Sequence, residues 1–139
     1  MKRIIFNICS IVVISGLLVS CIDLGLDDVQ TSVNDNSELY ETEWSTKDHS
    51  EGLKFYKDDT VMSFAGGTRS KGKFEYIKYS IISDTGSIGY ISFDGLEEYY
   101  SSYTVIIPGA SMLEDGSMKL YWYKLGEEKG YYEILYRRR

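Results

Sequence analysis

Cysteine and histidine are nearly absent from this sequence, which has two cysteines and one histidine in 139 residues. A structural zinc site takes about four such ligands, so we expect no bound metal of that kind. His49, the single histidine, lies between Asp48 and Ser50 in a polar segment. Adjacency along the chain does not create the geometry of a Ser-His-Asp triad, so we expect no catalytic residues there.

Long hydrophobic runs are absent beyond the amino terminus. Lys2 and Arg3 are followed by residues 4–19, which are almost wholly apolar. A membrane span needs roughly 20 apolar residues, whereas a basic start followed by a short apolar run is the plan of a secretory signal. We therefore predict that residues 1–20 are a signal peptide.

The end of that run, Leu18-Val19-Ser20-Cys21, resembles the lipobox of bacterial lipoproteins. The resemblance implies cleavage before Cys21, a diacylglycerol thioether on its sulfur and usually another acyl chain on its new amino group. One acyl chain holds a protein only marginally at a membrane, and a second or third makes the attachment lasting. Ile22, by resemblance to Gram-negative sorting rules, implies an outer-membrane lipoprotein, either periplasmic or surface-exposed. Because Cys9 leaves with the signal and Cys21 is acylated, no disulfide is expected.

Acidic residues outnumber basic ones, and the formal net charge is −6. The predicted signal contains Lys2 and Arg3 but no acidic residue, so its removal makes the mature chain more negative still. Polyanions repel such a chain, and we expect no binding to nucleic acid. The basic run Arg137-Arg138-Arg139 is interpreted as a solvated end of the chain.

Residues 21–38 are acidic, polar and without a hydrophobic period. Such a segment cannot bury enough apolar surface to become ordered, so we predict a flexible tether that is dispensable for folding. Residues 34–38 offer oxygen ligands but lack the central glycine of a calcium loop, so no calcium site is expected. The folded domain is predicted over residues 39–139.

From Tyr40 onward the composition shifts to aromatic and β-branched residues, which favour strands. Short runs of these residues alternate with turn residues at intervals of about ten, which is typical of an all-β sandwich or barrel. The predicted strands are 40–45, 52–57, 60–66, 72–82, 87–93, 98–107, 117–125 and 130–138. Hairpins can join all of them, so we predict an antiparallel up-and-down barrel of about eight strands, whose closure removes exposed strand edges.

Alternation along these strands predicts which side chains face the core. The predicted inward sets are Leu53 and Phe55, Phe74 and Tyr76, Ile91 and Phe93, Val105 and Ile107, Leu120 and Trp122, and Tyr132, Ile134 and Tyr136. Four charged residues lie between them and are predicted to face water: Lys54, Glu75, Lys119 and Glu133. The large inward rings should fill most of so short a barrel and leave a small pocket that is open at one end.

Five segments carry a resemblance to the small lipocalin-like domains of Gram-negative lipoproteins. They are Trp44, Leu53-Lys54-Phe55 leading to Asp58-Asp59-Thr60, Gly72-Lys73-Phe74-Glu75-Tyr76, Met118-Lys119-Leu120-Tyr121-Trp122, and Leu135-Tyr136-Arg137. The resemblance extends from about Tyr40 to Arg139. It implies a lipocalin-like barrel and leaves the ligand open.

Two patterns that often carry catalysis are interpreted as structural. Residues 67–73 nearly match a phosphate-binding loop, but Phe74 follows where Ser or Thr would hold Mg²⁺. Acidic pairs such as Asp58-Asp59 lie at neighbouring positions in turns, whereas a glycosidase needs carboxylates that face each other across a substrate. We therefore expect neither an enzyme nor a cofactor.

Tyrosine is in marked excess, with thirteen copies. Tyrosine and tryptophan make rigid amphipathic contacts that suit sugars and protein partners. We predict that Tyr76, Tyr103 and Trp122 bind a ligand, either a small apolar molecule, a glycan or an envelope protein. The alternative is a structural or inhibitory accessory subunit that docks on another envelope protein through its outer tyrosines.

Overall fold

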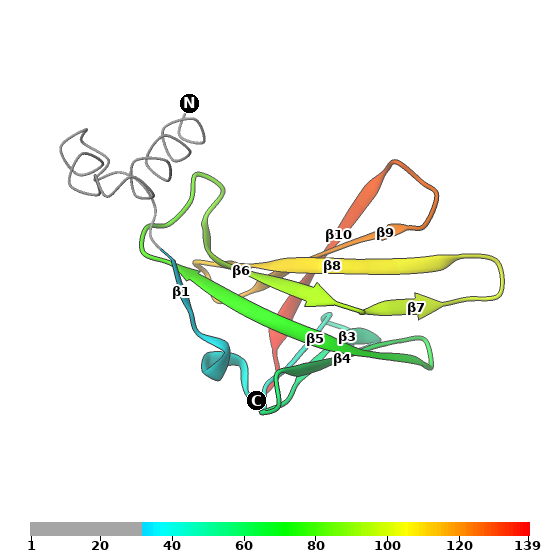
Figure 1. Ribbon diagram of the computed structural model, residues 1–139, viewed down its shortest axis with the longest axis horizontal. Helices are drawn as coiled ribbons and strands as arrows, with labels where there is room; N and C mark the ends of the chain where they lie inside the picture. Colours follow the sequence, from blue (N-terminus) through cyan, green and yellow to red (C-terminus); the bar gives the residue numbers. More distant parts are fainter. Residues whose placement is uncertain (1–31) are drawn as a thin grey trace, which may run out of the picture. The chain divides into compact units, whose positions relative to one another are not determined.

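The computed structural model describes residues 32–139, which form an antiparallel β-barrel (Figure 1). Each strand of the wall pairs with the next along the chain, and the last returns to pair with the first, so the sheet closes on itself. This confirms the predicted all-β, up-and-down barrel of eight strands. The strands of the wall are β2 (Glu43–Ser45), β3 (Glu51–Phe55), β4 (Thr60–Ala65), β5 (Thr68–Tyr79), β6 (Ser87–Asp94), β8 (Thr104–Leu113), β9 (Met118–Lys124) and β10 (Gly130–Arg137).

Three short elements complete the described chain: β1 (Ser32–Asn34), the 3₁₀ helix η2 (Asn36–Leu39) and β7 (Glu97–Tyr99). β7 follows β6 after a turn at Gly95 and, like β6, pairs with β8. β6 and β7 therefore behave as one interrupted strand of the wall.

The β7–β8 region differs from the prediction of one strand over 98–107 that ends at Pro108. The chain turns earlier, between Tyr100 and Tyr103, whose backbone N and O atoms are 2.9 Å apart. β8 then continues through Pro108, where its register against β9 shifts between Ile106 and Gly109. Proline lacks an N–H and is tolerated within a strand at such a bulge.

Apolar side chains fill one end of the barrel, which we call the closed end. Phe55, Val61, Met118 and Leu135 are fully buried there. The Phe55 and Phe74 rings meet edge to face, with centroids 4.8 Å apart, a favoured aromatic geometry. The predicted inward pairs on β3 and β5 are therefore confirmed as core.

Tyr76 belongs to this core and is 1% exposed. A Cβ atom at position 89 would lie 2.5 Å from its Cε2 atom. Glycine at this position lets the Tyr76 ring lie directly against the backbone of β6.

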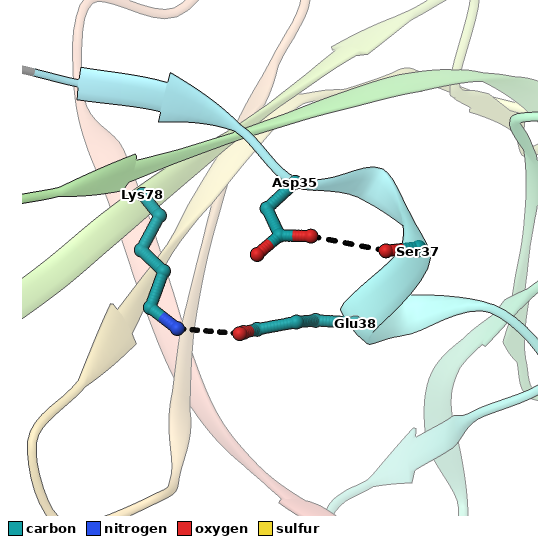
Figure 2. Close-up of polar contacts among 4 residues, drawn as sticks. All are labelled: Asp35, Ser37, Glu38 and Lys78. Carbon is teal, nitrogen blue, oxygen red and sulfur yellow. Dashed lines mark hydrogen bonds and ion pairs between the residues drawn. The ribbon is translucent and has the colours of Figure 1, made fainter.

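The segment that precedes the barrel lies against the closed end. β1 pairs with residues 77–79 of β5, and Leu39 of η2 is buried in the core. Asn36 accepts a hydrogen bond from the Tyr76 N–H at 2.7 Å, and its Nδ2 donates to Asp59 at 2.9 Å. Figure 2 shows the outer side of this segment, where Lys78 of β5 pairs with Glu38 and Ser37 donates to Asp35.

Residues 32–38 are thus part of the folded domain and not of a flexible tether, which corrects the predicted boundary at residue 39. Hydrogen bonds to β5 and to the β3–β4 turn satisfy the polar groups of this segment, so it becomes ordered while burying little apolar surface. Residues 1–31, which include the predicted signal peptide, Cys21 and the first part of the predicted tether, lie outside the described residues. Across residues 32–139, the structure shows no helix with the length and apolar character that crossing a membrane requires.

β10 has the opposite orientation to the prediction. Tyr132 and Tyr136 are exposed on the outside of the barrel, and Glu133 and Leu135 face the interior. Residues directly opposite each other in an antiparallel pair share a face, and Glu133 lies opposite Leu120 of β9. The inward set on β9 therefore fixes the inward set on β10.

Candidate functional site

A cavity of about 140 Å³ lies at the other end of the barrel, which we call the open end. The hairpins β4–β5, β7–β8 and β9–β10 all turn at this end, on the right-hand side of Figure 1. The residues that line the cavity are Glu51, Gly52, Ser63, Phe64, Ala65, Glu98, Tyr100, Tyr103, Val105, Ile107, Leu120, Trp122, Lys124 and Glu133.

Small side chains and a short strand create this space. β4 places Val61 inward at the closed end but only Ser63 and Ala65 toward the open end. In addition, β2 stops at Ser45 and the chain continues as a loop. β3 and β10 therefore have no strand between them at the level of Glu51 and Glu133.

Ser63 is the most buried polar residue of the cavity lining, with 1% exposure. Its hydroxyl oxygen has no hydrogen-bond partner within residues 32–139. Leaving a buried polar group without a partner costs about 1–3 kcal/mol. Such a group in a native interior calls for an explanation, and a bound molecule is one.

Three glutamates bring negative charge to the cavity: Glu51 on β3, Glu98 on β7 and Glu133 on β10. Glu98 is buried and accepts a hydrogen bond from the Tyr100 hydroxyl at 2.9 Å. Burial raises the pKa of Glu133 to about 7, helped by its hydrogen bond with Glu51 and by repulsion from Glu51, Asp48 and Glu98. Glu133 therefore keeps its proton to a higher pH than an ordinary glutamate does.

Aromatic rings also line the cavity. Trp122 stacks on Tyr131, with centroids 4.4 Å apart, and Tyr100 stacks on Tyr103 at 4.8 Å. Lys124 holds its Nζ atom 4.7 Å from the centroid of the Tyr103 ring. These contacts hold the rings against their neighbours.

Of the residues predicted to bind a ligand, the structure brings Tyr103 and Trp122 to this cavity. Tyr76 lies elsewhere, in the packed core of the closed end. Burial raises its pKa to about 12, and the charges of Glu38 and Asp35 add to the effect. That environment makes the Tyr76 ring part of the core of the barrel.

Sequence reasoning missed the glutamates and Ser63. One signal was available for Glu133: if Leu120 faces inward, the β9–β10 hairpin places a residue of β10 opposite it on the same face. Within residues 32–139, no group of three or more His, Cys, Asp or Glu side chains is arranged to hold a metal ion.

Neither the protein-family models, nor the curated proteins, nor the solved structures contain a match to this chain. The function of this protein is therefore inferred from the residues of the cavity and from the sequence.

Proposed function

We propose that this protein is a non-enzymatic binding module of the bacterial cell envelope. In this proposal, acylated Cys21 anchors it to the outer membrane, and a lipocalin-like barrel holds a small ligand at its open end. The observation that carries the proposal is the cavity itself, which contains a buried hydroxyl without a partner, that of Ser63.

The size of the cavity supports a ligand, or a part of one, with few atoms. An engineered cavity of about 150 Å³ in another protein holds one benzene molecule, and this cavity measures about 140 Å³. Val105, Ile107 and Leu120 give it an apolar wall. Apolar surroundings with a few placed polar groups are typical of small-molecule sites.

The outer surface favours a second candidate, the accessory subunit that docks on another envelope protein. Tyr99, Tyr132 and Tyr136 are exposed on the outside of the barrel, and exposed tyrosines are common at protein interfaces. Docking through the outer surface requires no cavity, so a binding test at the barrel interior distinguishes this candidate from the small-ligand binding module.

The test uses benzyl alcohol as a small neutral probe, with binding followed by ligand-detected NMR. The wild-type protein should bind it, and Ala65→Leu should weaken binding by about tenfold or more because its side chain enters the cavity. Met62→Leu on the same strand is the matched control, since Met62 faces outward. No binding to the wild type, or equal binding by both variants, would overturn the cavity as a ligand site.

The anchor is tested separately by growing cells with labelled fatty acid. Wild-type protein should carry the label and Cys21→Ser should not, because the predicted mature chain has no other cysteine thiol on which the thioether could form. Label on the Cys21→Ser protein would contradict the lipoprotein assignment.

A further inference from the structure

We propose that the ligand is a small organic cation, an ammonium group on an apolar body, with its charge lying among Glu51, Glu98 and Glu133. This inference rests on the proposed function and names the chemical class of the ligand. The observations that carry it are the charge of the cavity, the position of Ser63 and the arrangement of the rings.

The cavity carries more negative charge than the protein itself neutralises. Three glutamates line it against one lysine, Lys124. The ion pair in residues 32–139 joins Lys78 and Glu38, on the outside of the closed end. The cavity carboxylates therefore have no cationic partner within the described chain, and carboxylates in such a place are costly unless a cation accompanies them.

Ser63 points to the same kind of ligand independently of charge. Glu51 lies opposite Ala65 in the β3–β4 pair, and Ser63 is the next inward residue on β4. The Ser63 hydroxyl therefore lies on the same inward face as the Glu51 side chain, lines the same cavity and can accept a hydrogen bond. A primary ammonium group has three N–H donors and no acceptor, so it can serve two carboxylates and this hydroxyl together.

The rings suit a cation with an apolar body. Tyr100, Tyr103 and Trp122 present aromatic surface beside the glutamates, and the faces of such rings attract cations. Lys124 shows this attraction within the protein, since its Nζ atom lies over the Tyr103 ring. The apolar wall on β8 and β9 would receive the body of the ligand.

Other ligand classes fit less well. A carboxylate or phosphate would be repelled by the glutamates, and a neutral molecule would leave them without a counter-charge. Burial and the neighbouring carboxylates raise the pKa of Glu133, which agrees with this account because a cation held beside it would offset that repulsion.

The experiment compares three probes of similar size on the full protein by calorimetric titration: benzylamine, benzyl alcohol and benzoate. Benzylamine should bind about tenfold or more tightly than benzyl alcohol, because hydrogen bonds to charged groups are the stronger ones. Benzoate should bind most weakly.

Two variants and a control then locate the charge. Glu133→Gln and Glu98→Gln should each weaken benzylamine binding by about tenfold and leave benzyl alcohol binding within about twofold. Glu97→Gln is the control, since Glu97 is the neighbour of Glu98 on β7 and does not line the cavity. Unchanged melting temperatures, or an increase for Glu133→Gln, will show that the variants are folded.

Two results overturn the inference and leave the proposed function standing: benzyl alcohol or benzoate binding as tightly as benzylamine, or both cavity variants behaving like Glu97→Gln. If none of the three probes binds the wild type, the proposed function fails and the inference fails with it.

Discussion

The two ends of the barrel are built from the same strands but differ in what those strands place inside. β10 presents Leu135 at the closed end and Glu133 at the open end, and β4 presents Val61 and then Ser63. The side chains change from large and apolar to small or charged while the face of the strand stays the same. The barrel thus differs along its axis, with apolar packing at one end and, in our proposal, ligand recognition at the other.

The two ends also differ in how they contribute to the stability of the fold. Buried carboxylates and an unpartnered hydroxyl lower the stability of the open end, and apolar packing at the closed end can offset that cost. Functional sites commonly retain groups that are unfavourable for stability. The open end retains such unfavourable groups, and the closed end does not.

The largest expected effect contrasts one aromatic residue from each end. Phe55→Ala removes a fully buried ring that packs edge to face on Phe74, so it should lower the free energy of unfolding by about 3–5 kcal/mol. Trp122→Ala removes a half-buried ring at the cavity and one stacking contact, and it should cost only about 1–2 kcal/mol.

Urea titration of both variants measures this contrast, and Phe55→Leu serves as a milder control at the closed end. If Trp122→Ala lowered the free energy of unfolding as much as Phe55→Ala does, the open end would be packed as tightly as the closed end and the two ends would not differ.

The next effect tests whether residues 32–39 belong to the closed end. Asn36→Ala leaves the backbone N–H of Tyr76 without its acceptor, so it should destabilise the protein by about 1–3 kcal/mol. Ser37→Ala is the control, because Ser37 is exposed and its hydroxyl donates to Asp35, outside the core (Figure 2). If thermal melting does not distinguish the two variants, the hydrogen bonds of Asn36 add nothing measurable to the stability of the closed end.

The smallest effect is a pH dependence at the open end. The pKa of Glu133 is about 7 in the folded protein and 4.5 in an ordinary setting, so the folded state binds more protons between these values. Stability should therefore fall as pH rises from about 5 to 8. Solvent in the open cavity screens part of the effect, which leaves about 1–2 kcal/mol.

Glu133→Gln cannot lose a proton, so it should be more stable than the wild type at pH 8 and nearly equal to it at pH 4.5. Denaturation curves at the two pH values provide the measurement. A difference that is the same at both would show that the carboxylate is not repelled in the folded state.

The barrel could be predicted from the sequence because the patterns that specify its strands and turns are local. Leu53 and Phe55 flank the polar residue Lys54, and turn residues such as glycine and aspartate mark the ends of the strands. Alternation failed on β10, where the outward residues Tyr132, Ile134 and Tyr136 are more apolar than the inward residues Glu133 and Leu135. The choice between two such faces depends on the pairing with β9, and a one-residue shift exchanges them.

The cavity could be predicted only in part. Tyr103 and Trp122 could be predicted because tyrosine and tryptophan make the rigid amphipathic contacts that suit ligands. Ser63, Glu51 and Glu98 come from three separate strands, and each alone resembles an ordinary surface residue. These residues come together only when the barrel closes, and their proximity cannot be predicted from a single sequence.

Closure itself depends on a narrow seam. β10 meets β2 at two paired positions, Tyr136 with Ser45 and Arg137 with Trp44, and Ser45 and Arg138 are 93 residues apart along the chain. Contacts between distant residues form late, because the chain must first lose the entropy of the intervening loop. The hairpins should therefore form first and the ring should close last. The cavity, which borders this seam through Glu51 and Glu133, would then be among the final parts of the molecule to take shape during folding.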